Sequence, residues 1–494
     1  MSPIVIWPLT CTILCLVLFV LYRRMNHLKH IPTIGPEGPV LSNFGAIRFL
    51  FDANNMLRRG FSKHQDTIFK VPDLSQWVLA ISGTKLVEEF RKVPEDILSS
   101  KIATDEILQI QYTLGDRISD NPYHIPIVRS QLTRNLGKLV PELQNEVVVA
   151  FNETMPLDSE RKEIRVVDSF MQIVCRASNR AFVGLPLCRN QDFVDLNVKF
   201  TVDVMTAATI LRMLPHFMRP LVAKVLTNVQ SRIRHGIKHL RPVIEQRRLH
   251  NQSDKKEVES LDMLSWLMSE AQGDELSVDS LTRRILTVNF AAIHTSTMTF
   301  AHAVYYLAEN QPYMQPLREE IRNIVQLEGW TKEALDKMDK VDSFIRESQR
   351  MHALGCLLMY RQAVKDYTFS DGTFIPRGTT LAVAVDASHF EDESYDNANE
   401  FKGFRFSDMK SEGDSRKLGM VSAQPEFLAF GYGRHACPGR FFAAVELKLM
   451  LAHLVMFYDI KLKNGATRPS DIYIASTRIP NPKGCVLLRQ RKND

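Results

Sequence analysis

The chain has 494 residues, 45% of them hydrophobic and 24% charged, a composition typical of a globular protein and not of a disordered one. Its net charge of +6 is compatible with an anionic membrane surface or an acidic redox partner. The basic residues are dispersed and no nucleic-acid-binding motif occurs, which excludes nucleic acid as a partner. The seven cysteines form neither a zinc-binding pattern nor a disulfide framework.

The N-terminus carries an apolar run over residues 4–22, close to the length of about 20 residues that spans a bilayer, followed by Arg23 and Arg24. It predicts a membrane anchor over residues 1–24, with the chain beyond it in the cytosol. The alternative is a cleaved signal peptide, but the run has almost no charged segment before it and no small-x-small site at its end.

Residues 25–40 are rich in proline and predict a non-helical hinge between the anchor and the body, because proline fixes φ and restricts the residue before it. No linker rich in glycine, serine or proline interrupts the rest of the chain. We therefore expect one large domain over residues 41–494.

The body alternates long helical patterns with short strand patterns, which predicts a mainly α fold with small β-sheets. Residues 65–93 predict a small sheet followed by a helix from near Lys85. Two prolines break the apolar segment 210–223, which fits a membrane interface or the packing of two helix ends equally well. Residues 281–310 predict a long apolar helix, and residues 359–385 predict short strands.

A glycine-rich loop over residues 430–443 delivers Cys437 to the start of an apolar helix that only Glu446 and Lys448 interrupt. We expect the glycines at 431, 433 and 439 to allow close backbone approach and positive φ. A thiolate beside a helix N-terminus, with Arg434 and His435 just upstream, suits haem iron and its carboxylates. The alternative is a structural cysteine in a tight turn.

This loop resembles the signature Phe-x-x-Gly-x-Arg-x-Cys-x-Gly of the haem-thiolate cytochrome P450 monooxygenases. Phe430, Gly433, Cys437 and Gly439 match the signature, whereas His435 stands where the family usually has arginine. The resemblance implies the cytochrome P450 fold and haem b as the cofactor, with Cys437 as the axial ligand of the iron. His435 would then lie beside a haem propionate.

Further motifs follow in the family's order along the chain. In the long helix Thr295 and Ser296 match the oxygen-binding motif, while His294 replaces its carboxylate. Thr295 would assist dioxygen activation by hydrogen bonding, with His294 or water relaying protons. Glu347 and Arg350, three residues apart on one helix, would form a buried ion network with Arg405.

The family also places basic residues against the haem propionates, and Arg361, Arg129 and His124 hold the corresponding positions here. An exposed surface arginine is the alternative for Arg361 and Arg129. By position, residues 356–360 and 477–480 would line the substrate side.

The resemblance implies a single-pass protein of the endoplasmic reticulum membrane that oxidises a lipophilic molecule with dioxygen. Because the chain has no flavin or nicotinamide fingerprint, electrons would come from an NADPH-cytochrome reductase, with cytochrome b5 as a further candidate donor. The loop and long-helix motifs are similar to those of a fungal subgroup that includes ent-kaurene oxidase-like enzymes. Many members of that subgroup act on terpenoids, indole diterpenes and meroterpenoids, so the resemblance implies a secondary metabolite of the terpenoid type as the substrate.

Two alternatives remain open. The same haem site could isomerise or dehydrate an oxygenated substrate without external electrons. This alternative stays open because position 294 lacks the carboxylate that the family usually has there. The chain could instead be a membrane-bound haem carrier or sensor, although such a protein needs neither Thr295 nor apolar substrate-facing segments.

Overall fold

The computed structural model describes residues 28–74, 76–252, 261–414, 416–463 and 465–491. These residues are mainly helical, with small sheets, as the sequence predicts. The predicted anchor over residues 1–24 and the first three hinge residues lie outside the described part. Among the residues described, no helix is both long and apolar enough to cross a membrane.

The largest sheet has five strands in the order β1-β2-β8-β5-β3. Apolar residues predominate in β2 and β8, two of its central strands, and β1, β2 and β8 are buried along their whole length. β2 and β8 pair in parallel, with Leu79 opposite Leu381, whereas the other pairs are antiparallel. The strands span β1 (Ile68–Pro72), β2 (Trp77–Ile81), β3 (Leu98–Ser99), β5 (Leu357–Ala363) and β8 (Thr380–Ala384).

Within the described residues, three smaller sheets lie outside this one, and each pairs its strands antiparallel. Strand β12, near the C-terminus, joins β4 and β9 from two distant parts of the chain, which fastens the C-terminal segment to the helical body. Their strands span β4 (Lys162–Arg165), β6 (Tyr367–Thr368), β7 (Phe374–Ile375), β9 (Tyr458–Lys461), β10 (Ile472–Ile474), β11 (Thr477–Ile479) and β12 (Cys485–Gln490).

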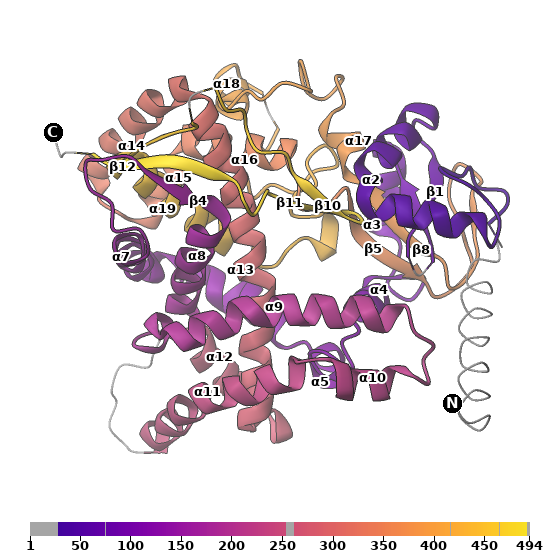
Figure 1. Cartoon of the computed structure of the whole chain (residues 1–494), viewed down its shortest axis with the longest axis horizontal. Coiled ribbons are helices and arrows are strands. Elements are labelled where there is room, and N and C mark those ends of the chain that lie inside the picture. The colour runs from indigo at the N-terminus through magenta and orange to yellow at the C-terminus, as the bar shows by residue number, and fades with distance from the viewer. Residues whose placement is uncertain (1–27, 75, 253–260, 415, 464, 492–494) are drawn as a thin grey trace, which may run out of the picture.

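Helix α13 (Val278–Glu309) runs through the middle of the helical body (Figure 1). It begins where the Ser277 hydroxyl accepts a hydrogen bond from the backbone N–H of Ser280 at 3.2 Å, a regular N-cap. Residues are buried around most of its circumference, because α8, α9, α11, α16 and α19 all pack against it. The sequence-predicted helix over residues 281–310 is confirmed.

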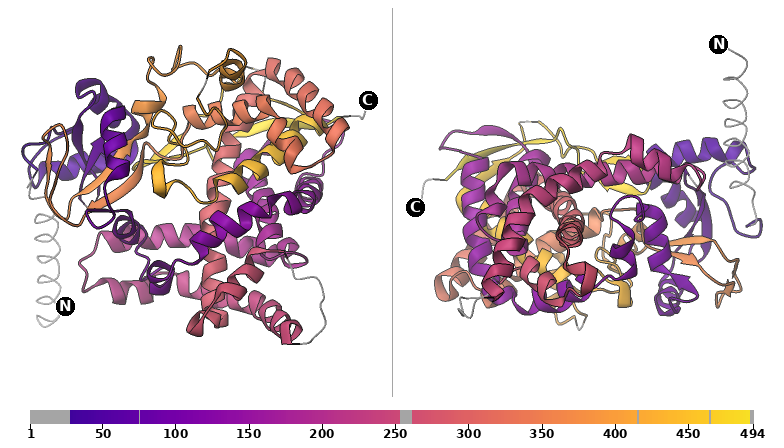
Figure 2. Two further views of the ribbon diagram at one scale, coloured as in Figure 1. Left: turned by 180° about the vertical axis from the view of Figure 1, so that it is seen from behind. Right: turned by 90° about the horizontal axis from the view of Figure 1, so that it is seen from below.

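The other helices surround α13 and the five-stranded sheet (Figures 1 and 2). They span α2 (Leu41–Lys63), α3 (Thr84–Lys92), α4 (Ser100–Leu108), α5 (Asp116–Asp120), α6 (His124–Ile127), α7 (Leu136–Thr154), α8 (Val166–Phe182), α9 (Gln191–Arg212), α10 (Arg219–Leu226), α11 (Val229–Gln252), α12 (Met263–Glu270), α14 (Met314–Glu328), α15 (Lys332–Lys337), α16 (Asp339–Met351), α17 (Val385–His389), α18 (Arg405–Ser411) and α19 (Arg440–Phe457). A single π-helical turn, Val128–Leu132, follows α6.

Several predicted boundaries agree with the structure. The strands expected within residues 65–93 are β1 and β2, and the helix expected from near Lys85 is α3. Residues 28–40 contain no helix, as expected of the hinge. The segment 210–223 breaks between the end of α9 at Arg212 and the start of α10 at Arg219.

Candidate functional site

The loop that carries Cys437 is shaped by two glycines. Gly431 and Gly433 have φ of 71° and 75°, and a Cβ on Gly433 would come within 3.3 Å of the Arg91 side chain. Gly439 is different: its φ is −88°, so the expected positive φ is wrong at that position, where any residue can adopt the backbone conformation. Gly439 immediately precedes α19 and serves as its N-cap.

The loop also holds Cys437 by its backbone. The Cys437 N–H donates to the carbonyl of Phe430 at 2.8 Å, and the Arg440 guanidinium donates to the Cys437 carbonyl at 3.0 Å. Burial raises the pKa of the Cys437 thiol, although the N–H groups of Gly439 and Arg440 lie beside the sulfur and oppose that shift. The neutral thiol is therefore favoured at this site, and a bound iron would hold it as the thiolate.

A cavity of about 510 Å³ separates this loop from α13, and both Cys437 and Thr295 line it. Its volume is in the range of cofactor and ligand sites. The apolar lining residues are Ile125, Val128, Leu132, Phe182, Val288, Ala291, Ala292, Ala353, Leu354, Leu358, Met359, Ala429, Phe430, Pro438, Phe442, Ala443 and Leu447. Leu358 and Met359 fall within the predicted substrate-facing stretch 356–360, whereas no residue of 477–480 lines the cavity.

The residues present fit a haem. A large, flat and mostly apolar cofactor needs apolar walls, a thiol on one of them, and polar groups at an edge for its carboxylates. The cavity supplies the first two in the lining and in Cys437, while His124 and His435 supply polar groups on it.

His124 and His435 are each held by neighbours. The His124 Nδ1 accepts a hydrogen bond from Arg284 at 3.0 Å, and burial, followed by the charge of Arg284, lowers the pKa of His124 to about 4. His435 contacts the Ser100 hydroxyl at 3.1 Å and a carboxylate oxygen of Glu95 at 3.1 Å. Burial is the largest cause that lowers the pKa of His435.

The two predicted arginines do not line the cavity. Arg361 is buried, and its guanidinium donates to the carbonyls of Phe90 and Val93 at 2.8 and 3.0 Å, at the end of α3. Burial lowers its pKa to about 10. Arg129 is exposed and donates to the carbonyl of Arg434 at 3.4 Å, so it lies against the cysteine loop. Contact of either arginine with a haem propionate stays a prediction.

Thr295 and His294 point in different directions from the middle of α13. The Thr295 hydroxyl lies in the cavity and donates back to the carbonyls of Ala291 and Ala292 at 2.7 and 3.0 Å. The His294 Nε2 instead contacts the carbonyl of Val198 on α9 at 3.0 Å, and burial lowers its pKa. Adjacent helical residues diverge by about 100°, so His294 does not line the cavity, and its expected position as a proton relay is not the one it takes.

The ion network expected behind the loop is present. Glu347 accepts two hydrogen bonds from Arg350, both at 2.8 Å, and one from Arg405 at 3.1 Å. All three residues are buried. The two guanidiniums also donate to several backbone carbonyls, among them those of His389, Ala398 and Asp396. A buried cluster this fully satisfied ties α16 and α18 together.

Two groups near the cavity, His352 and Glu446, were given no functional role from the sequence, whereas Ser296 was matched to the oxygen-binding motif. Ser296 lines the cavity beside Thr295, and its hydroxyl lies close enough to Glu446 of α19 to oppose the rise that burial causes in the pKa of that carboxyl. His352 also lines the cavity and is fixed by Tyr306 and Asp471, each at 2.8 Å. Of His352 and Glu446, only Glu446 carried a signal in the sequence, because a carboxyl within an otherwise apolar helix is unusual.

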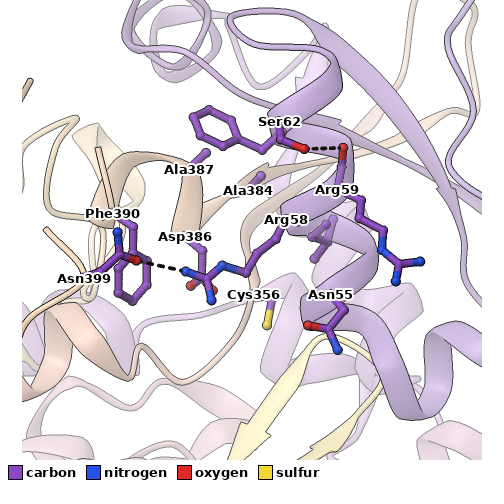
Figure 3. Close-up of a pocket in the computed structure, with 12 residues that line it drawn as sticks. Asn55, Arg58, Arg59, Ser62, Cys356, Ala384, Asp386, Ala387, Phe390 and Asn399 are labelled. Carbon is purple, nitrogen blue, oxygen red and sulfur yellow. Dashed lines mark hydrogen bonds between the residues drawn. The ribbon is translucent and has the colours of Figure 1, made fainter. Parts of the chain in front are cut away.

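A second pocket, of about 430 Å³, lies between α2 and α17 (Figure 3). Figure 3 shows Arg58 of α2 turned toward Asn399, with which it forms a 3.2 Å hydrogen bond. Cys356 lines this pocket, but burial raises the pKa of its thiol to about 12 and Asn399 and Arg58 make the lining polar. The cavity beside Cys437 is therefore the candidate haem site.

A cysteine thiol at the start of a helix, an apolar cavity and a facing helix with a cavity-lining threonine define a haem-thiolate protein. Comparison with known families agrees: the chain belongs to the cytochrome P450 family, whose model matches residues 35–485. Membership of this family makes Cys437 the thiolate ligand of the haem iron, with electrons supplied by a reductase.

Relatives are similar along nearly the whole chain. Cytochrome P450 monooxygenase 151 of Postia placenta is 42% identical over 475 residues, which cover 95% of each chain. Cytochrome P450 monooxygenase CYP512U6 of Ganoderma lucidum is 32% identical over 97% of this chain and 96% of its own. Ent-kaurene oxidase of Gibberella intermedia is 32% identical over 90% of this chain and 85% of its own. The chain is accordingly a cytochrome P450 monooxygenase.

Proposed function

We propose that this monooxygenase hydroxylates or further oxidises a lipophilic secondary metabolite of the terpenoid, indole diterpene or meroterpenoid type. The observation that carries the proposal is the apolar lining of the cavity between Cys437 and α13. The side chains of Val288, Ala291 and Leu358 line it and cannot form hydrogen bonds, so they favour a hydrocarbon substrate. Similarity to a protein named ent-kaurene oxidase supports a terpenoid substrate.

Different residues of the chain have different roles in the proposed reaction. Cys437 holds the haem by its sulfur, and the buried network of Glu347, Arg350 and Arg405 supports the elements behind the loop. When bound, the haem supplies dioxygen activation, which thiolate ligation favours. Apolar side chains hold the substrate and exclude water, while the Thr295 hydroxyl, already hydrogen-bonded to its own helix, presents a lone pair and a movable proton to the cavity.

We further propose that the protein sits on the endoplasmic reticulum membrane with its catalytic domain in the cytosol. Large apolar side chains are exposed on α2, on α10 with the segment before it, and on β10, and Figures 1 and 2 place these elements on one side of the molecule. Phe51 of α2, Phe217 and Leu221 are 71%, 74% and 69% exposed. Such a surface favours contact with lipid. NADPH-cytochrome reductase, with cytochrome b5 as a further donor, completes the proposed system.

The substrate proposal is tested on microsomes that contain the full chain and a fungal reductase. A reduced carbon-monoxide difference spectrum first verifies the thiolate-ligated haem. Ent-kaurene, lanosterol and an indole diterpene are then screened for shifts of the haem band, and products are sought by mass spectrometry under ¹⁸O₂. One ¹⁸O atom in a terpenoid product is expected. Binding only of non-terpenoid compounds, such as fatty acids, would contradict the terpenoid assignment.

The membrane proposal has its own test. Without residues 1–24 the body should still sediment in part with anionic vesicles, and Phe217→Ser with Leu221→Ser should lower that fraction. The matched control is Leu327→Ser on α14, which is 85% exposed but away from this surface. Equal sedimentation of all three proteins would contradict the assigned surface.

A second candidate function is that of a haem-thiolate isomerase or dehydratase, and one observation favours it. His294, which stands where the family usually has a carboxylate, faces α9 and not the cavity. Product formation without NADPH, reductase or dioxygen would support it, and strict dependence on all three would exclude it.

A further inference from the structure

Asp192, His235 and His239 form a cluster of metal-ligating side chains that the function described above leaves unused. Asp192 lies in the first turn of α9, and both histidines lie on α11, which packs beside α9 (Figure 1). The Nε2 atoms of His235 and His239 are 2.7 and 2.9 Å from the same oxygen, Oδ2 of Asp192. One ligand atom from each residue lies within 4.8 Å of the other two, so small side-chain shifts would let all three contact one ion.

The spacing of the histidines on α11 places both imidazoles on one face of the helix. Residues four apart lie one turn apart on the same side, as in the helical His-x-x-x-His pairs that bind zinc. The two rings have centroids 5.1 Å apart and an interplanar angle of 40°. His239 also packs edgewise against Phe193 of α9, with centroids 5.6 Å apart, which restricts its orientation.

A bound metal ion would take the place of the two hydrogens that now face Asp192. Since an ionised carboxylate only accepts hydrogen bonds, the Nε2 atom of each ring donates to it. Neither Nδ1 atom has a hydrogen-bond partner in the part of the chain that the structure describes, so the hydrogen of each ring can move to Nδ1 and free the lone pair of Nε2. The Asp192 side chain is 63% exposed and can rotate to complete the contact.

No lysine or arginine among the described residues forms an ion pair with Asp192, and a second cluster shows why this matters. His302, His352 and Asp471 also lie close together. There the Nη2 atom of Arg468 contacts all three, at 2.8, 3.3 and 2.8 Å. The guanidinium already supplies the positive charge that a metal ion would bring, so only the cluster around Asp192 remains a candidate metal site.

We propose that Asp192, His235 and His239 bind a divalent transition-metal ion, with Zn²⁺ as the best fit and water as the remaining ligand, and that the ion joins the start of α9 to α11. Two imidazoles and one carboxylate favour zinc, because imidazole suits transition metals whereas Mg²⁺ and Ca²⁺ prefer oxygen ligands. None of the three residues lines the haem cavity, so the site is separate from the oxygenase chemistry and does not depend on its substrate.

Isothermal titration calorimetry on the full-length, haem-loaded protein, freed of metal with EDTA, tests zinc binding. We expect zinc to bind at this site and Mg²⁺ not to bind there. His235→Gln, His239→Gln and Asp192→Asn should each weaken zinc binding at least about tenfold, because even loss of a group that orients a metal ligand costs roughly that much. His250→Gln is the matched control on α11, at a histidine whose Nδ1 contacts the Gln246 carbonyl at 2.9 Å, and it should keep the wild-type affinity.

X-ray absorption at the zinc edge identifies the ligands without interference from the haem iron. Nitrogen and oxygen neighbours at about 2.0–2.2 Å are expected, together with the scattering of imidazole rings. A sulfur neighbour at about 2.3 Å would place the zinc on a cysteine and overturn the proposal. Equal zinc affinity in the wild type and in all three variants would overturn it as well.

Hydrogen exchange, followed by mass spectrometry, tests whether the ion joins the two helices. Zinc should slow backbone exchange at least about twofold in both 191–196 and 233–241, because opening of either helix would then break a metal contact. The same addition to His239→Gln should leave exchange unchanged. Each variant should keep the reduced carbon-monoxide spectrum of the wild type, which verifies its fold, and a variant that loses this spectrum leaves the decision to the other two. Slower exchange in only one of the helices would contradict the link between them.

Discussion

The two walls of the haem cavity, the loop that carries Cys437 and the facing part of α13, are held in place in different ways. On the Cys437 wall the backbone is fixed by Gly431 and Gly433, by the hydrogen bond to Phe430, and by the buried ion network of α16 and α18. On the α13 wall the Thr295 hydroxyl bonds only within its own helix. The first wall holds one atom in place, whereas the second offers hydroxyls that can exchange partners.

Removal of the ligand on the first wall should have the largest effect. We expect Cys437→Ser to lose the thiolate-type reduced carbon-monoxide spectrum and all oxygenase activity, because no other cysteine lines the cavity in the described part of the chain. Cys356→Ser is the matched control, since that buried thiol lies in the pocket of Figure 3. A thiolate-type spectrum that survives in Cys437→Ser would contradict the ligand assignment.

The support behind this wall should come next in effect. Glu347→Gln leaves the guanidiniums of Arg350 and Arg405 buried without a counter-charge, which typically costs about 3–5 kcal/mol. We expect a lower thermal midpoint and a reduced ratio of haem to protein. Glu328→Gln, which breaks an exposed pair with Lys337, is the control and should cost less than about 1 kcal/mol. Equal effects of the two changes would mean that the network does not support the site.

The α13 wall should show a different phenotype, one of efficiency and not of assembly. Thr295→Val should bind haem normally but raise peroxide release at the expense of water or product, with a loss of coupling of about tenfold. Thr297→Val is matched in kind, because Thr297 also bonds back to its helix, at 2.7 Å to Ile293, but lies outside the cavity. Unchanged coupling in Thr295→Val, or an equal loss in Thr297→Val, would remove the distinction between the two walls.

The difference between the walls also explains what the sequence could predict. The Cys437 wall is encoded locally: a ten-residue motif and two short motifs on α16 and before α18 carried both the ligand and its network. The direction of His294 and the surroundings of Ser296 depend on which helices pack beside α13, and those helices, α9 and α19, are distant in sequence from α13. The same reasoning applies to Arg361. Its place on a strand could be predicted, but its guanidinium donates to carbonyls at the end of α3, a contact that depends on how distant segments pack.

The smallest effect is expected at the edge of the cavity, where His435 departs from the family signature. His435 is one-third exposed, and Ser100 and Glu95 already hold its ring, so little of the cavity's structure depends on it. We expect His435→Ala to change haem retention during dialysis by less than about threefold, in keeping with the modest value of exposed polar contacts. His435→Arg should retain haem at least as well as the wild type, because arginine can donate two parallel hydrogen bonds to a carboxylate. Complete loss of haem in His435→Ala would show instead that this imidazole is a principal anchor of the cofactor, and that the rigid wall extends from Cys437 to the cavity edge.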